Sequence, residues 1–550
     1  MRPIGPDSRE PPSPPSDSRP AIVRDLLRPE SLRRGARGTV ELRTTHASWV
    51  FLCGADVFKL KRPVDLGFLD FRTIEARRRD CEDEVRLNRR LAPDIYLGVL
   101  PVRRDRAGHR VDEQGEGEIA DWVVHMRRLP DEASAASLLA RGRLNRDRLA
   151  ALASTVAGSL DAAPSAARFG EVAALRHNVE ENLAQSRPFA APDGMVEPDV
   201  LEAIWRHSDR TLRLRSELFT ARARGGRIRE GHGDLRLEHV YFVPSFVSSP
   251  TGHERPVVID CVEFSERLRA GDVAAEIAFL AMELEAAGQP ALAAGFVARS
   301  AEALDDFDLY GVLDFYLAYR AWVRAKVAGL VARDPQTDHP VRARKLEEAR
   351  LYFSLARASG ARPVARPALV AVGGVIGSGK STLAAALGAE LAAPVVGSDR
   401  TRKAMAGLAP TERGSDELYT AERIDATYAE LLRRAEVVLG SGRTVIVDAT
   451  FESPLWRRRA ADLARASGAR FAFIEASCPD WIVLRDRVRE RAARPAISDA
   501  GEALVDRRLA EGQAPRLPDG DDHLLVDTRG STYESVRRAL EALRALDITP

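Results

Sequence analysis

The residues best suited to carry chemistry form a glycine-rich segment in the C-terminal third of the chain, residues 374–381, GVIGSGKS. This segment follows an apolar run and precedes a helical pattern, so its backbone N–H groups can wrap phosphates at a helix N-terminus. Lys380 would reach the β- and γ-phosphates, and the Ser381 hydroxyl would bind Mg²⁺. The predicted phosphate-binding residues are Gly374, Gly377, Ser378, Gly379, Lys380, Ser381 and Thr382.

Two aspartates end apolar runs near this segment. Asp448 closes the run TVIVD, where a strand end would bring its carboxylate beside the bound metal. Asp399 follows a second run, where it could accept the proton of an acceptor hydroxyl while Arg402 holds an anionic part of the acceptor. The structural alternative for each aspartate is capping of the next helix.

Arginines recur along the helical pattern at 481–494, at Arg487, Arg491 and Arg494. Arginines on such a helix can close over transferring phosphate. The alternative is a solvated face. We take Arg487 and Arg491 as candidate nucleotide ligands.

A second set of candidates lies in the N-terminal half. The motif HGDLRLEH runs from His232 to His239, and the apolar run Val257-Val-Ile ends at Asp260. Asp234 could orient an attacking hydroxyl, and Asp260 could hold Mg²⁺ on the phosphates.

A lysine and a glutamate upstream complete this second set. Lys59 lies in a strand pattern and Glu84 near the apolar seam of the next helix, and such a pair grips the α- and β-phosphates in kinase-like folds. Lys61 shares the strand face with Lys59, so the pattern leaves the choice between the two lysines open.

The elements that must position these residues fall into two groups. Short strands are expected within 39–61, 95–103, 119–128 and 228–264, with helices at 73–91, 133–225 and 271–357, which is an α+β arrangement. After residue 367, apolar strands alternate with helices, which predicts an α/β domain with a parallel sheet. The expected division is a disordered tail at 1–20, a domain at 21–358, a linker at 359–367 and a domain at 368–550.

The motifs resemble known families. The segment 368–545 is similar to small P-loop kinases of the gluconate-kinase, zeta-toxin and polynucleotide-kinase type. HGDLRLEHV and the run ending at Asp260 resemble aminoglycoside and choline phosphotransferases, which have a protein-kinase-like fold. Nearly the whole chain after residue 21 resembles bacterial fusion proteins described as bifunctional aminoglycoside phosphotransferase/ATP-binding proteins, which implies ATP and Mg²⁺ as cofactors.

One position departs from the phosphotransferase pattern. His239 stands where that family has a metal-binding asparagine. Imidazole suits Mg²⁺ poorly, so His239 could bind a softer ion such as Mn²⁺, Glu238 could substitute, or the site could bind ATP with little turnover. A structural role for His239 is the remaining alternative. The β-rich lobe also lacks a GxGxxG loop, so phosphate cover would fall to the backbone near 45–48.

Composition narrows the classes of partner and compartment. The 82 basic and 81 acidic residues give a net charge of +1, which argues against nucleic acid and anionic membranes as partners. The sequence has no run of 18 or more apolar residues, so no membrane-spanning helix is predicted. The proline-rich N-terminus lacks the features of a signal peptide. Four isolated cysteines fit a reducing cytoplasm. The acidic run that follows Asp260 suggests either a solvated helix face or attraction of a cationic substrate, and it comprises Glu263, Glu266, Asp272, Glu276 and Glu283.

The sequence therefore predicts a phosphotransferase with two nucleotide sites, each moving the γ-phosphate of ATP to a hydroxyl of a small molecule. One rival interpretation makes the N-terminal domain a nucleotide sensor that regulates the P-loop kinase. Another makes the acceptor a nucleic-acid 5′-hydroxyl or a protein. The sequence does not identify either acceptor or the oligomeric state.

Overall fold

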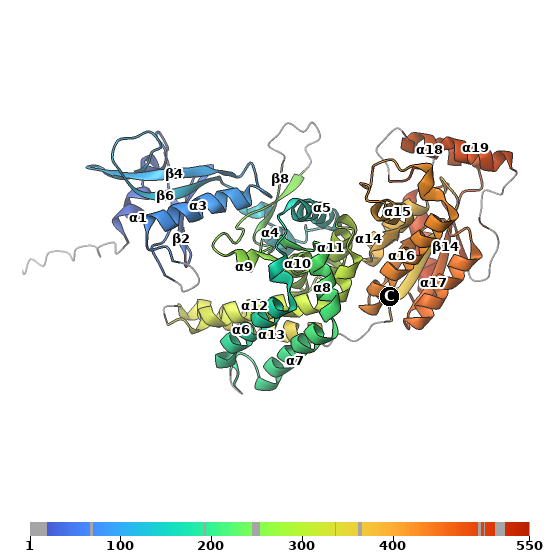
Figure 1. The fold of residues 1–550 in the computed structure, drawn as a ribbon. Coiled ribbons are helices and arrows are strands. Elements are labelled where there is room, and N and C mark those ends of the chain that lie inside the picture. The colour runs from blue at the N-terminus through green and yellow to red at the C-terminus, as the bar shows by residue number, and fades with distance from the viewer. Residues whose placement is uncertain are drawn as a thin grey trace, which may run out of the picture. The chain divides into compact units, whose positions relative to one another are not determined.

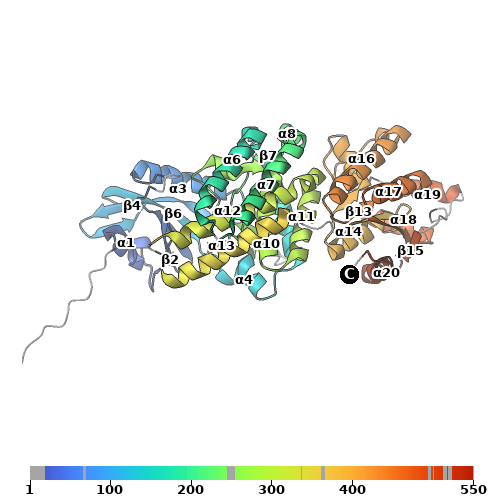
Figure 2. The same cartoon turned by 90° about the horizontal axis from the view of Figure 1, so that it is seen from below.

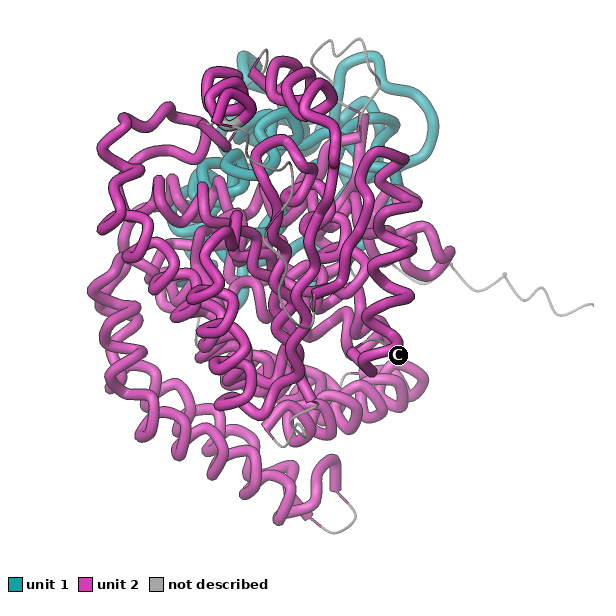
Figure 3. Tube along the Cα trace, turned by 90° about the vertical axis from the view of Figure 1, so that its right-hand side faces the viewer, with its two compact units in different colours: residues 1–130, 259–265 teal, residues 131–258, 266–550 magenta. Residues whose placement is uncertain are grey.

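The computed structural model divides the chain into two compact units, coloured separately in Figure 3. Unit 1 comprises Met1–Pro130 and Ile259–Ser265, and unit 2 comprises Asp131–Val258 and Glu266–Pro550. Within the described residues, no helix has the length and apolar character needed to cross a membrane. The expected tail, apart from its last two residues, the middle of the expected linker and Arg494 lie outside the described residues. The described residues are 19–65, 70–191, 194–244, 254–335, 337–360, 366–492, 497–499, 501–511, 517 and 523–548.

Unit 1 is built on a six-stranded antiparallel sheet with the strand order β1-β2-β3-β6-β4-β5. The hairpin between β2 and β3 turns at Gly54, which has φ 60°, so that Cys53 pairs with Asp56. Helix α3 begins where the Thr73 side chain accepts a hydrogen bond from Ala76 N, and it packs against β4 and β6 (Figure 1). The elements are α1 Ala21–Leu26, α2 Pro29–Leu32, β1 Glu41–Thr44, β2 Ser48–Cys53, β3 Asp56–Lys61, α3 Ile74–Asn88, β4 Tyr96–Asp105, β5 Gly108–Val111 and β6 Glu118–Arg127.

Unit 2 begins with a mostly helical lobe. Its central helix α10 has an apolar composition all round and is buried over most of its length, which is typical of a core helix. The lobe also holds two strand pairs, β7 with β10 and β8 with β9. The HGD loop, residues 232–239, lies between β7 and β8 in the chain. The main elements are α4 Ala135–Ala140, α5 Arg146–Ala162, α6 Val172–Ser186, α7 Pro198–Leu214, α8 Ser216–Arg224, β7 Ile228–Glu230, β8 Val240–Pro244, β9 Glu254–Val258, α9 Glu266–Arg269, β10 Ala270–Asp272, α10 Val273–Ala286, α11 Pro290–Ala303, η4 Phe307–Gly311, α12 Leu313–Arg333 and α13 His339–Gly360.

The rest of unit 2, from Ala368, is a five-stranded parallel sheet with the order β12-β13-β11-β14-β15. All residues of the central strand β11 are buried, as expected of a parallel strand covered on both faces. Helices α14 and α20 cover one face of the sheet, and α16 and α17 cover the other (Figure 2). The elements are β11 Ala368–Gly373, α14 Lys380–Leu391, β12 Val395–Gly397, α15 Ser398–Met405, η5 Asp416–Tyr419, α16 Ala421–Gly440, β13 Val445–Asp448, α17 Pro454–Ala466, β14 Arg470–Ser477, α18 Trp481–Ala492, α19 Glu502–Ala510, β15 His523–Asp527 and α20 Thr532–Ala545.

Three members of the acidic run after Asp260 fit neither suggested role, a solvated helix face or attraction of a cationic substrate, whereas Glu266 is 48% exposed. Asp272, Glu276 and Glu283 are buried, at 3%, 4% and 7% exposure. A buried carboxylate needs hydrogen-bond or charge partners. These three carboxylates have such partners in the helical lobe, so they support the fold of the lobe from within.

Candidate functional site

The segment 374–379 forms a tight loop between β11 and α14. Gly374, Gly377 and Gly379 have φ of 146°, 77° and 86°, which residues with a Cβ rarely adopt. A Cβ on Gly377 would lie 2.7 Å from Leu484 O, so this position also needs glycine for space. The loop therefore has the backbone geometry that exposes N–H groups to phosphate.

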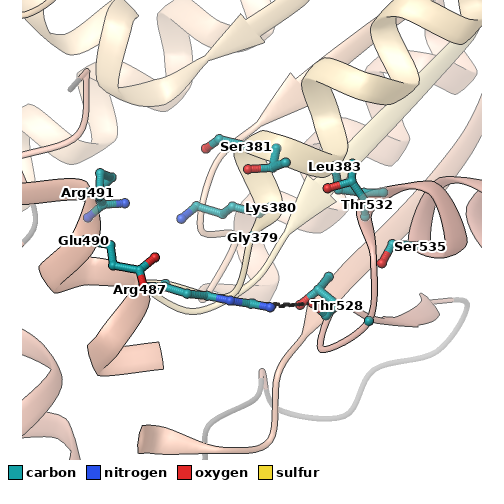
Figure 4. A pocket seen from close by; sticks show the side chains of 13 residues that line it. Gly379, Lys380, Ser381, Leu383, Arg487, Glu490, Arg491, Thr528, Thr532 and Ser535 are labelled. Atoms are coloured by element: carbon teal, nitrogen blue, oxygen red, sulfur yellow. Dashed lines mark hydrogen bonds between the residues drawn. The ribbon is translucent and has the colours of Figure 1, made fainter. Parts of the chain in front are cut away.

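A cavity of about 740 Å³ opens beside this loop (Figure 4). Helix α18 and the connection from β15 to α20 form its other walls. The lining residues include Gly377, Gly379, Lys380, Ser381, Thr382, Arg487, Glu490, Arg491 and Thr528. The predicted loop residues and the predicted arginines therefore line one cavity. Glu490 and Thr528 line it too, and no sequence motif indicated them.

Asp448 lies at the end of β13, paired in register with Val372 of β11. Burial raises the pKa of Asp448, and Lys380 and the Ser381 hydroxyl oppose that shift. Asp448 Oδ1 is buried and has no hydrogen-bond partner among the described residues. A hydroxyl and a carboxylate oxygen are hard ligands of the kind that Mg²⁺ prefers, so Ser381 and Asp448 fit the predicted metal.

Two of the arginines of α18, Arg487 and Arg491, lie on the cavity wall. Arg487 Nη2 donates to Thr528 O at 2.6 Å (Figure 4). Thr528 Oγ1 in turn donates to Ser378 O of the loop at 2.6 Å. Arg487 thus connects α18 through Thr528 to the phosphate loop, while Arg491 lies one helical turn further along the same wall.

Asp399 and Arg402 lie on the short helix α15, directly after β12. Arg402 Nη1 donates to Asp399 Oδ1 at 2.6 Å, and the guanidinium stacks 4.7 Å from the centre of the Tyr419 ring. The carboxylate of Asp399 contributes to the raised pKa of Asp448. These two residues therefore form an ion pair at the carboxyl end of the sheet, where α/β folds bind ligands.

In unit 1, Lys59 and Lys61 differ sharply in their surroundings. Lys59 Nζ lies 2.9 Å from Glu84 Oε1 and 2.9 Å from Asp260 Oδ1. Lys61 Nζ is enclosed by three carboxylates, at 2.7 Å from Asp80, 2.6 Å from Glu84 Oε2 and 2.5 Å from Glu263. The exposed fractions of the two lysine side chains are 15% and 1%. Lys59 is the lysine that can reach a ligand, and Lys61 is a buried counterion.

Charge balance explains why both lysines remain ionised. Burial alone would lower the pKa of Lys59, but Asp260 and Glu84 outweigh it and raise that pKa well above its ordinary value. The same opposition, with Glu263 and Glu84 as the main partners, raises the pKa of Lys61. Burial raises the pKa of Glu263 to about 7. Glu84 is shared by the two ammonium groups, so Lys61 fixes the carboxylate that orients Lys59.

The segment that carries Asp260 is anchored to unit 1 through its backbone. Asp260 has φ 65°, an unusual conformation for a residue with a Cβ. The Tyr96 hydroxyl accepts a hydrogen bond from Asp260 N at 3.1 Å, and Asn88 Oδ1 accepts one from Cys261 N at 2.9 Å. Sequence reasoning missed Tyr96 and Asn88, because neither belongs to a motif.

The HGD loop in unit 2 is held by two glutamates of α10. Glu276 accepts a hydrogen bond from Gly233 N at 3.0 Å, and Glu283 accepts one from Leu237 N at 2.8 Å. Burial raises the pKa of Glu276. Gly233 has φ 82°, and a Cβ there would lie 2.8 Å from Arg269 Cα. The acidic run therefore shapes the loop that presents Asp234.

His239 lies close to the backbone of that loop. Its Nδ1 is 2.9 Å from Asp234 O, and a carbonyl can only accept, so Nδ1 carries a proton. In the neutral ring the lone pair is then on Nε2, which lies 3.6 Å from a Glu238 carboxylate oxygen. This tautomer suits a structural role and also leaves Nε2 with the chemistry of a metal ligand.

Comparisons with known proteins identify relatives of the whole chain and of its P-loop part. A family model described as AAA domain matches residues 369–515. The protein Rv2004c of Mycobacterium tuberculosis is 34% identical over 525 residues, which is 92% of this chain and 96% of the relative. Together with the architecture described above, the family model confirms the expected α/β P-loop domain with a parallel sheet, and the N-terminal part has the expected α+β arrangement.

Among solved structures, a choline/ethanolamine kinase family protein from Mesorhizobium loti is 14% identical, with a TM-score of 0.34. The match covers 60% of this chain and 96% of that one. A gluconokinase from Sinorhizobium meliloti is 22% identical, with a TM-score of 0.25, and covers 33% of this chain and 94% of its own.

The contrast between the two lysines of unit 1 can be measured. In a Lys380→Ala background, which disables the P-loop, we expect Lys59→Met to weaken binding of a fluorescent ATP analogue by at least about tenfold with little loss of stability. Lys61→Met leaves three buried carboxylates short of a cation, so it should lower the free energy of unfolding of unit 1 by about 3–5 kcal/mol. Native-state hydrogen exchange of the β3 amides measures that loss. Equal effects of the two substitutions on both readouts would contradict the assignment.

A second test concerns the phosphate loop. Gly377→Ala should weaken ATP binding by about tenfold or more, because the new Cβ lies 2.7 Å from Leu484 O and forces the loop to move. Gly468→Ala is the matched control, with φ 65° and no atom within 4 Å of the new Cβ. Both substitutions carry similar backbone strain, so similar ATP affinities in calorimetric titration would show that the close contact does not matter.

Proposed function

We propose that this chain, which belongs to the family of the mycobacterial protein Rv2004c, is an ATP-dependent phosphotransferase with two nucleotide sites. Each site transfers the γ-phosphate of ATP to a hydroxyl of a small molecule. The observation that carries the proposal is the cavity at the P-loop, which Lys380 and Ser381 line. Both residues interact with Asp448, one of whose oxygens has no hydrogen-bond partner among the described residues. That combination of groups suits a nucleotide with its metal.

In the P-loop domain, the loop amides and Lys380 bind the β- and γ-phosphates, and Ser381 with Asp448 holds Mg²⁺. The metal, when bound, neutralises charge that develops on the phosphate oxygens. Asp399 accepts the proton of the acceptor hydroxyl, and Arg402 turns from Asp399 to an anionic part of the acceptor. Arg491 closes over the transferring phosphate. Arg487 holds the wall formed by Thr528.

The proposed N-terminal reaction uses the Lys59 cluster and the HGD loop. Lys59, oriented by Glu84, binds the α- and β-phosphates, and it must exchange its bond to Asp260 for one to phosphate. Asp260 would then be available to a divalent cation, and His239 is a second proposed metal ligand. Asp234 orients the acceptor hydroxyl.

The acceptors we propose are small molecules. A net charge of +1 gives the chain no overall field for nucleic acid. A salt-dependent mobility shift with single-stranded oligonucleotides would instead favour a nucleic-acid acceptor. The four cysteines are free and buried, which fits the cytoplasm as the proposed compartment.

One observation favours a second candidate function for the N-terminal part. His239 bonds the backbone of Asp234 through Nδ1, which gives it a structural role without any metal. If that is its only role, the N-terminal part binds nucleotide with little turnover and senses it for the P-loop domain. Phosphate transfer by separately inactivated chains distinguishes the two functions.

We expect two separable activities. Lys380→Ala removes the P-loop ammonium and Asp234→Ala removes the proposed N-terminal base, and each should cost its own site orders of magnitude. Each single variant should retain one ATP-consuming activity, and the double variant should retain none, in transfer of ³²P to a mixture of cell metabolites. Loss of all transfer in Lys380→Ala, while that variant still binds ATP, would favour the sensor.

The metal preference tests His239. As a ligand, its imidazole should make Mn²⁺ a better activator than Mg²⁺ at the N-terminal site. His239→Asn should shift the preference back toward Mg²⁺, measured as the ratio of the two rates in the Lys380→Ala background. An unchanged ratio, with the variant folded, would leave His239 a purely structural residue.

A further inference from the structure

The helical lobe and the P-loop domain, both within unit 2, are in contact through the C-terminal end of α11 and the turn that follows it, Glu302–Phe307. Glu302 carboxylate accepts a hydrogen bond from Val395 N at the start of β12, at 2.7 Å. The Glu302 carbonyl accepts one from Arg400 of α15. The turn thus contacts both elements that lead to Asp399.

The next residues of the turn bind a buried arginine of the P-loop domain. Asp305 has φ 46°, and its two carboxylate oxygens accept hydrogen bonds from Arg434 of α16 at 2.7 and 2.9 Å. Arg434 Nη1 also donates to Thr401 Oγ1 of α15 at 3.3 Å. Its guanidinium lies 5.5 Å from the centre of the Phe307 ring, and its side chain is 9% exposed. One fork-shaped cation therefore fixes the turn to the helix that carries Asp399 and Arg402.

The same turn is tied to the HGD loop by a second arginine. Arg222 of α8 donates to Asp306 at 2.8 and 2.9 Å and to Asp272 at 2.6 and 2.7 Å. All three side chains are at most 2% exposed. The Asp272 carboxylate also caps α10 by accepting a bond from Ala274 N at 2.8 Å. That helix holds Gly233 N through Glu276.

We propose that the turn Glu302–Phe307 of the helical lobe positions the acceptor helix α15 of the P-loop domain, and that Arg222 and Arg434 link α15 through this turn to the HGD loop. Arg434 is a positioning residue for the P-loop reaction. The link to the HGD loop rests on the proposed function, since it matters only if Asp234 serves a nucleotide site.

The physical basis is the rigidity of buried, bidentate charge pairs. A guanidinium that fills two fixed directions leaves the partner carboxylate little freedom, and leaving either group buried without the other is costly. If the HGD loop moves when nucleotide binds, the movement is therefore transmitted through α10 and Asp272 to the turn, because rigid buried contacts connect these elements. Coupling between the HGD loop and α15 through this network can be tested by replacing one of its arginines.

The test compares Arg434→Met with Arg433→Met in the full chain. Arg433 also joins α16 to the lobe, through Asp308 at 2.8 Å, but it is 46% exposed, and its bonding partners are Asp308 and Glu430 rather than α15. We expect the α15 amides to exchange about tenfold faster in Arg434→Met than in Arg433→Met or the unaltered chain. ATP affinity at the P-loop should change by less than about twofold, because neither arginine lines that cavity.

The same exchange experiment tests the link. In the Lys380→Ala chain, ATP with Mg²⁺ should slow exchange of the α15 amides, and this response should be lost on adding Arg434→Met and kept on adding Arg433→Met. Unchanged α15 exchange in nucleotide-free Arg434→Met overturns the positioning role. An ATP response that survives Arg434→Met, or no response although the Lys380→Ala chain binds ATP, overturns the link. Failure of that chain to bind ATP overturns the proposed N-terminal nucleotide site and leaves the positioning result standing.

Discussion

A buried carboxylate is costly unless a cation or an amide compensates it, and both candidate sites are built around this constraint. In unit 1, Lys61 compensates Asp80, Glu84 and Glu263, which leaves Lys59 at the more exposed edge of the cluster. In unit 2, Glu276 and Glu283 are compensated by backbone amides of the HGD loop. The groups that compensate the buried carboxylates are thus in contact with the segments that carry the candidate site residues.

The P-loop site departs from this rule at one atom. Asp448 is 9% exposed, and one of its oxygens has no hydrogen-bond partner among the described residues. Burial raises the pKa of Asp448, and the interactions with Lys380 and Ser381 partly offset that rise. A divalent cation would supply the missing compensation. The exception is therefore the reason why Asp448 is proposed as a metal ligand.

Charge pairing also extends from one site toward the other. Arg222 and Arg434 each bind two elements that are far apart in sequence, and the turn between them belongs to the helical lobe. Because these pairs are buried, they are less screened by salt than surface pairs and resist small shifts. The two candidate sites need not act independently, even though each has its own proposed nucleotide-binding groups.

The sequence by itself determined the local features: the glycine-rich loop, the aspartates at strand ends, the alternation of strands and helices, and the HGD motif. These depend on neighbours along the chain, so spacing and periodicity reveal them. It could not choose between Lys59 and Lys61, because both lie on one strand face and only the packing of α3 and the Asp260 segment separates them. It also misjudged Glu276 and Glu283, since a charge run looks alike whether it is solvated or buried against a loop. Tertiary structure decided which carboxylates are shared, because ion pairs such as Lys61–Glu263 and Arg434–Asp305 join residues more than 100 positions apart.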